Sequence, residues 1–196
     1  MVERMRIGLI SDTHIPEAMP ELWPHVYEVF DGCEAILHAG DIYDVSVVES
    51  LNDVAPTWSA RGNGDDGSSG RFVQPDHPLL ADTWVHEFGG VNVGLIHHMP
   101  VPEMRHYKVA DALDRHFGGH DLDVVVYGDT HVEHITEIDG LLLVNPGSPT
   151  YPHNLSVQYG TVGFLDIADG RASASVWRLN ETGIEEFDWD TWGRPW

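Results

Sequence analysis

The chain has little cysteine and little positive charge. Cys33 is its only cysteine among 196 residues, so no intramolecular disulfide can form and no zinc site can be built from several thiolates. Only 10 basic residues stand against 32 acidic ones, and Lys108 is the only lysine, which gives a formal net charge of -22. Such a chain offers no basic stripe for a nucleic-acid backbone, and we expect nucleic acid not to be its partner.

Long apolar runs are also missing. No stretch approaches the roughly 20 residues that a transmembrane helix needs, so we expect no membrane partner. Residues 1–6 run directly into a predicted strand, without the apolar core or the small-residue cleavage site of a signal peptide. Together with the single cysteine, these features predict a protein of the reducing cytoplasm.

The acidic residues are scattered over most of the predicted surface segments rather than gathered in one tail. This distribution favours adaptation to concentrated salt, in which the Debye length falls to about 3 Å at 1 M, over a single cationic partner. The hydrophobic content of 42% is sufficient for a packed core, and no linker is visible. We therefore predict one domain over residues 1–196, with an acidic, tryptophan-rich tail at 185–196. A homo-oligomer is left open.

Predicted strands alternate with helices in the first half of the chain. The strands are expected at 6–10, 35–38 and 57–60, and the helices at 22–30 and 46–54, the second opened by a capping box of Ser46 and Glu49. A proline-rich loop follows at 72–82. The second half predicts a helix at 109–117, a buried strand at 123–127, and hairpins at 84–96, 135–144 and 161–179. A parallel-leaning first half and an antiparallel second half predict two packed sheets with helices outside.

Polar motifs stand at the ends of five predicted strands. They are Asp12-Thr13-His14, Gly40-Asp41, Gly62-Asn63-Gly64-Asp65, His97-His98 and Gly128-Asp129-Thr130-His131. An aspartate after a strand often only caps the next helix, so one motif alone would indicate little. Five of them favour a site for two adjacent metal ions, because imidazole nitrogens and carboxylate oxygens suit divalent transition metals.

The order of these motifs, followed by Asn145-Pro146-Gly147-Ser148-Pro149, resembles that of the calcineurin-like metallophosphoesterases. Within them the chain is most similar to the small YfcE-type group of bacterial and archaeal phosphodiesterases. The resemblance extends from Ile7 to about Leu179. It implies a four-layer αββα sandwich of two mixed β-sheets flanked by helices, with the metal site at the carboxyl ends of the strands.

The resemblance also implies two divalent metal ions and their ligands. The first ion would take Asp12, His14 and His131, the second would take Asn63, His97 and Asp129, and Asp41 would bridge them. Manganese is the expected metal, with nickel, iron, cobalt, zinc or magnesium as alternatives. A metal-bridging hydroxide would then attack phosphorus, and Asp41 and Asn63 would belong to the catalytic residues as well.

Three positions depart from the family pattern. Asp129 stands where relatives usually have histidine, and its harder oxygen favours manganese or magnesium at the second ion or leaves that ion weakly bound. The alternative is that Asp129 does not ligate a metal ion directly, or that the second site is degraded. Gly64 stands where many relatives have a histidine or cysteine, and in larger phosphatases that histidine protonates the leaving group. His98 stands where relatives usually have glycine. His98 and His153 are the candidate substitutes for the missing acid, and we assign the role to His98.

Two further assignments follow from the residues themselves. His97 rather than His98 is the expected metal ligand, because neighbours on a strand point to opposite faces. Asp65 is expected to orient Asn63 or its loop rather than to contact a metal ion.

The sequence thus predicts a metal-dependent phosphoesterase acting on a small phosphodiester or phosphomonoester. The first alternative is a non-catalytic metal-binding scaffold of the same fold. A nuclease is the less favoured alternative, because the chain is short and acidic and has no basic groove. The physiological substrate cannot be identified from the sequence.

Overall fold

The computed structural model describes residues 4–100 and 108–190. Seven strands form one mixed sheet: β1 (Met5–Ile10), β2 (Ala35–His38), β3 (Thr57–Ala60), β4 (Leu80–Ala81), β10 (Thr161–Ala168), β11 (Arg171–Asn180) and β12 (Gly183–Glu186). Five strands form the other: β5 (Thr83–Phe88), β6 (Val91–Ile96), β7 (Val124–Val126), β8 (His134–Ile138) and β9 (Leu141–Asn145). The helical segments are α1 (Pro24–Phe30), α2 (Ser46–Asn52), α3 (Val109–Phe117) and the short 3-10 turn η1 (Pro152–Asn154).

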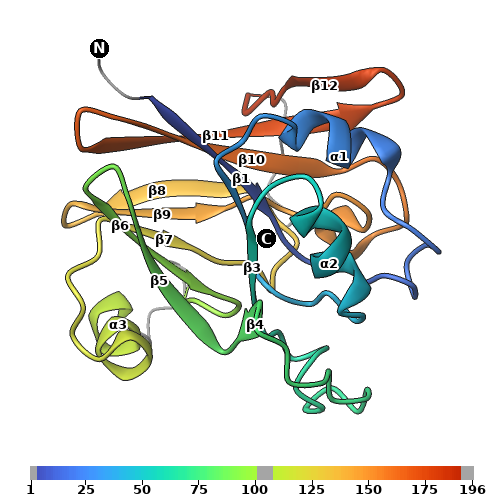
Figure 1. Ribbon diagram of the computed structural model, residues 1–196, viewed down its shortest axis with the longest axis horizontal. Helices are drawn as coiled ribbons and strands as arrows, with labels where there is room; N and C mark the ends of the chain where they lie inside the picture. Colours follow the sequence, from blue (N-terminus) through green and yellow to red (C-terminus); the bar gives the residue numbers. More distant parts are fainter. Residues whose placement is uncertain (1–3, 101–107, 191–196) are drawn as a thin grey trace.

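The two sheets pack face to face, and helices lie on their outer faces (Figure 1). Alternate residues of β1 divide between the layers: Ile7 and Leu9 join Val93 and Val126 of the other sheet in the central core, whereas Ile10 packs with α1 and α2. Phe117 of α3 belongs to a third cluster, on the far side of the five-stranded sheet. The predicted four-layer αββα sandwich is confirmed.

Pairing between the strands corrects the predicted division into halves. The seven-stranded sheet has the order β12-β11-β10-β1-β2-β3-β4, and the other has the order β5-β6-β7-β9-β8. β1 pairs parallel with β2 but antiparallel with β10, so the C-terminal hairpin joins the N-terminal strands rather than the strands before it. β7 pairs parallel with both β6 and β9. Each sheet is therefore mixed, and neither belongs to one half of the chain.

Smaller differences from the predicted elements have local causes. Ser46 is not the N-cap of α2, because Val45 holds that position without a side-chain cap and the Oδ1 atom of Asp44 accepts a hydrogen bond from the Ser46 N–H at 2.9 Å. β4 lies within the predicted loop. β12 was not predicted and takes in the first residues of the predicted tail, of which residues 191–196 lie outside the described ranges. No helix within those ranges is long and apolar enough to cross a membrane.

Candidate metal centre

The polar motifs converge where strands of both sheets end. β1, β2 and β3 lead into Asp12, Asp41 and Asn63, and these neighbouring strands run parallel, so their carboxyl ends meet at one edge. β6 and β7, which are also parallel to each other, lead into His97 and Asp129 from the other sheet. The site is therefore built at the junction of the two sheets.

The backbone takes a rare conformation at these strand ends. Positive φ angles, which non-glycine residues seldom adopt, occur at Asp12 (53°), His14 (51°), Asp41 (56°), Asp129 (70°) and His131 (57°). Hydrogen bonds between the ends hold this geometry, since Asp12 N–H donates to the Gly40 carbonyl at 2.9 Å and His14 N–H donates to the Asp41 carbonyl at 3.1 Å. Residues held in such sparsely populated conformations cluster at functional sites.

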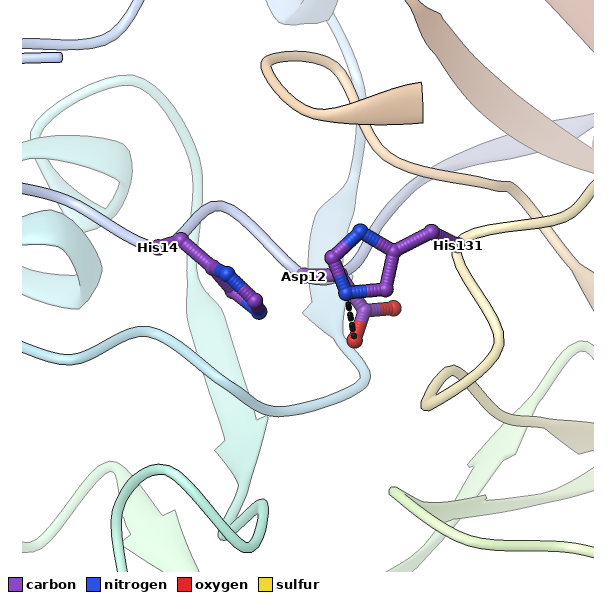
Figure 2. A group of neighbouring side chains, drawn as sticks. All are labelled: Asp12, His14 and His131. Carbon is purple, nitrogen blue, oxygen red and sulfur yellow. Dashed lines mark ion pairs between the residues drawn. The ribbon is translucent and has the colours of Figure 1, made fainter. Parts of the chain in front are cut away.

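Asp12, His14 and His131 form the first group of side chains that could hold a metal ion, with one potential ligand atom from each within 4.8 Å of the others. Figure 2 shows the His131 ring over the Asp12 carboxylate and the His14 ring to one side. His131 Nε2 lies 3.6 Å from Asp12 Oδ1. The other ring nitrogen of His131 donates to the Tyr151 carbonyl at 2.7 Å, which leaves the Nε2 lone pair for a cation.

A second group that could hold a metal ion is formed by Asp12, Asp41 and His97, so Asp12 belongs to both groups. One carboxylate oxygen of Asp41 is 3.2 Å from His14 Nε2, and the other is 3.4 Å from His97 Nε2. His97 donates from Nδ1 to the Ala39 carbonyl at 2.7 Å, so its Nε2 is also left as the free ligand atom. Asn63 Oδ1 lies 3.2 Å from that Nε2 atom.

Asp129 lies at the edge of the site, outside both tight groups. Its Oδ1 atom is 3.7 Å from His97 Nε2, and its Oδ2 atom is 2.9 Å from His98 Nδ1. The His97 side chain is 5% exposed and the His98 side chain 58%, so His97 is the buried member of the pair, although both rings approach Asp129. All seven residues predicted to bind metal therefore lie at one site, and His98 joins them through Asp129.

The backbone packs so closely around these carboxylates that two nearby glycines have no space for a side chain. A Cβ atom at Gly62 would collide with the Asp41 carboxylate, and one at Gly128 would collide with the Ser11 hydroxyl. Asp65 is fully buried and accepts hydrogen bonds from the backbone N–H groups of residues 42, 43 and 62, at 3.3, 2.9 and 2.9 Å. Asp65 therefore orients the loop, in the role predicted for it.

Three supporting residues were not assigned such contacts from the sequence. His38, the last residue of β2, is fully buried and joins two motifs, accepting a hydrogen bond from Gly40 N–H at 3.1 Å and lying 3.1 Å from Thr13 Oγ1. Ser148 donates to the Asp12 carbonyl at 2.7 Å. Tyr43 stacks on the His14 ring with centroids 4.1 Å apart. A polar residue inside the apolar run 35–38 was the one available signal, and it pointed to His38.

The electrostatics of the site favour a bound cation. Burial raises the pKa of Asp12 to about 7, although the nearby His97 opposes the shift. Burial also opposes ionisation of Asp41, but hydrogen bonds and charge from His14 and His97 outweigh it and hold the Asp41 pKa below its usual value. Within the described ranges the ion pairs of Asp12 and Asp41 are made with histidines. Since a buried carboxylate without a full counter-charge is costly, the donor set fits a divalent metal.

Comparison with known proteins gives a consistent result. The model of the calcineurin-like phosphoesterase superfamily domain matches residues 5–170. A probable metallophosphoesterase of Methanothermobacter thermautotrophicus is 35% identical over 150 residues, which cover 76% of this chain and 79% of that protein. A phosphodiesterase of Methanocaldococcus jannaschii is 26% identical over 152 residues, covering 73% of this chain and 83% of that protein.

Solved structures with this fold fall into two groups. Vacuolar protein sorting 29 from Cryptosporidium parvum has a TM-score of 0.72 at 20% identity, covering 93% of this chain and 95% of that chain. Vps29 from Entamoeba histolytica, solved with zinc, has a TM-score of 0.66 at 20% identity, covering 92% and 96%. A predicted phosphoesterase from Streptococcus pneumoniae has a TM-score of 0.63 at 18% identity, covering 95% and 99%. These likenesses concern the fold.

The raised pKa of Asp12 predicts how metal binding depends on pH. Below about pH 7 this carboxyl holds a proton that a cation must displace, so apparent Mn²⁺ affinity should fall by up to about tenfold per pH unit as pH is lowered from about 8 to 6. Titration calorimetry in two buffers of different ionisation enthalpy measures both affinity and proton release. Asp12→Asn should lose the Asp12 proton release, whereas exposed Asp53→Asn should retain it. Equal affinity at both pH values would contradict the prediction.

Proposed function

The chain belongs to the calcineurin-like phosphoesterase superfamily, and from that premise we propose that it is a metal-dependent phosphoesterase acting on a small phosphodiester or phosphomonoester. The observation that carries this proposal is the position of Asp41, whose two oxygens lie 3.2 Å from His14 Nε2 and 3.4 Å from His97 Nε2. A carboxylate shared in this way suits two cations about 3.5–4 Å apart, because it offsets their repulsion.

The proposal assigns seven side chains as ligands of two ions. In our proposal Asp12, His14 and His131 hold the first ion, Asn63, His97 and Asp129 hold the second, and Asp41 contacts both. Two bound divalent ions would supply an activated water molecule as nucleophile and positive charge for the phosphoryl oxygens. Because Asn63 turns its amide oxygen toward His97, its NH₂ group is left to donate a hydrogen bond to the substrate.

A cleft beside the second group of ligands has room for a small substrate. Its volume is about 630 Å³, within the range of about 300–1,000 Å³ that is usual for small-molecule sites. Side chains from both sheets and from α3 line it, among them Asn63, His97, His98, His116 and Asp129. A phosphoryl group held at the ligands could therefore extend one ester group into this cleft.

The carboxylate at position 129 bears on the choice of metal. Asp129 Oδ1 lies 3.7 Å from His97 Nε2, so a hard oxygen faces the second ion where relatives present an imidazole. Hard oxygen ligands favour manganese or magnesium, while the histidines keep nickel, iron, cobalt and zinc as alternatives. We propose manganese as the metal at both positions.

A scaffold of the same fold is the second candidate, because similar solved structures include vacuolar protein sorting 29. The donor set favours catalysis over this alternative. Each of the seven ligand positions holds an aspartate, asparagine or histidine, and Asp41 approaches a histidine of each group with one of its two oxygens. A pure scaffold does not need such a set.

Asp41→Asn tests the central assignment. The variant replaces one Asp41 oxygen by an NH₂ group and removes the negative charge, so turnover should fall by more than the roughly 10–100-fold that loss of an outer hydrogen-bond partner of a metal site costs. The measurement is metal content together with hydrolysis of bis(p-nitrophenyl) phosphate and p-nitrophenyl phosphate in Mn²⁺. Exposed Asp44→Asn is the matched control. Unchanged activity in the Asp41 variant would remove the bridging role, and a manganese-loaded wild type without turnover would favour the scaffold.

Asp129→His restores the residue usual in relatives. We expect the variant to stay active, within about tenfold of the wild type, while its preference moves from manganese toward zinc, because an imidazole is the softer ligand. Activity across Mn²⁺, Mg²⁺ and Zn²⁺, each with the metal content measured, checks this. The same metal preference in both proteins would show that Asp129 does not contact the second ion.

His98→Asn tests the proposed general acid. His98 lines the cleft that holds His97, whereas His153 lies 2.8 Å from Glu133 and lines a different cavity. Loss of an acid should slow esters with alkyl leaving groups by about 10²–10⁴-fold and hardly affect p-nitrophenyl esters, whose leaving group needs no proton. His153→Asn is the control. Equal losses for both kinds of ester would exclude this role for His98.

A further inference from the structure

A second cleft opens beside His14 and shares no lining residue with the cleft that contains His98. Its volume is about 260 Å³, and it is lined by His14, Glu17, Ala18, Arg71, Tyr151 and Val157. Because His14 is among the proposed ligands, a phosphoryl group at the metal centre lies next to this opening. The mechanism proposed above gives the cleft no role.

Arg71 is held rigidly in the wall of this cleft. Its guanidinium donates two hydrogen bonds to Glu17, at 3.0 and 2.8 Å, and one to the Ser69 hydroxyl at 3.3 Å. It also lies over the Tyr43 ring, 4.1 Å from the centroid, and that ring stacks on His14. A guanidinium fixed along its edge and on one face offers its remaining planar face for stacking.

The charges within the cleft largely cancel. Glu17 neutralises Arg71 through a two-pronged ion pair, and Ala18, Tyr151 and Val157 add uncharged surface. Because the Glu17 carboxylate already neutralises the guanidinium and takes two of its five N–H donors, an additional anionic group would gain less from it. An uncharged ring would meet Tyr151, Val157 and Arg71 in the lining of the cleft, and contact of such a ring with aromatic and apolar side chains does not depend on charge.

The size of the cleft restricts its occupant to one ring system. A cavity of about 150 Å³ holds benzene, so 260 Å³ suits an aryl group or a single heterocyclic base. Val157 is 45% exposed, which leaves the outer side of such a ring open to solvent. The remainder of a larger substrate could continue from there.

We propose that this cleft binds an uncharged planar ring that the substrate carries next to its phosphoryl group, and that Arg71, Tyr151 and Val157 determine this preference. The inference rests on the proposed function, since the phosphoryl group must be held at the metal centre. It adds a substrate class, phosphoesters with an aryl or heterocyclic group, and assigns residues to it.

The test compares methylphosphonate with phenylphosphonate, which carry the same anionic head and differ by the ring. Neither can be hydrolysed, so titration calorimetry on the manganese-loaded protein reports binding without turnover. Wild type should bind phenylphosphonate about tenfold more tightly, and Tyr151→Leu and Arg71→Ala should each bring the ratio of the two dissociation constants close to one. The ratio cancels any change in affinity for the head, including repulsion by an unpaired Glu17.

Matched controls separate the cleft from general damage. Arg171→Ala removes an exposed arginine at the start of β11, and Tyr27→Leu removes a tyrosine of α1. Both should keep the wild-type ratio. The double variant Glu17→Gln with Arg71→Ala removes both charges of the pair and should lose the preference as the single Arg71 variant does. Val157→Ala changes only a partly exposed side chain and should reduce the ratio in a folded protein.

The outcomes are distinguishable from those that test the proposed function. Binding of both phosphonates by the wild type with a ratio near one would overturn the inference while the phosphoesterase proposal stands. A ratio of ten that survives in the Arg71 and Tyr151 variants would overturn it as well. Binding of neither phosphonate, together with absent hydrolysis of bis(p-nitrophenyl) phosphate, would reject the proposed function and the inference with it.

Discussion

The burial of Asp12 and Asp41 beside each other is the constraint on which the rest of the site depends. Asp12 is fully buried and Asp41 is 4% exposed, and within the described ranges histidines are their ion-pair partners. At Asp12 burial costs more than the histidines offset, and the pKa rises to about 7, whereas at Asp41 the effects of His14 and His97 outweigh burial and lower the pKa. A pair of divalent cations would turn the same arrangement into a stabilising one, because the negative charge would then have its counter-charge.

The fold maintains this unfavourable arrangement through the sheets rather than through the site itself. β1 is central to the seven-stranded sheet, paired with β2 on one side and β10 on the other, and its apolar residues face two different cores. Such a strand cannot shift without exposing buried side chains. The strand ends that carry Asp12 and Asp41 therefore stay together, and the positive φ angles at both residues persist.

Local features of the sequence predicted most strands and two packed sheets, whereas the four layers and the proposed ligands were implied by the resemblance to a known family. Motifs that follow a short apolar run reveal both a strand and what stands at its end, so Asp41 and His97 could be placed without coordinates. Pairing between strands that are far apart in the sequence has no such signal, and the pairing of β10 with β1 is known only from the structure. Contacts formed between distant loops were equally hidden, for example the hydrogen bond from Ser148 to the Asp12 carbonyl at 2.7 Å.

Local contacts accompany each of the three departures from the expected family pattern. A Cβ atom at Gly64 would collide with the Tyr43 ring, so no histidine fits there while Tyr43 stacks on His14. His98 Nδ1 lies 2.9 Å from Asp129 Oδ2. An imidazole at position 129 would give His98 no carboxylate to pair with. Tyr43 thus occupies the space beside Gly64, and the carboxylate at position 129 orients the imidazole of His98.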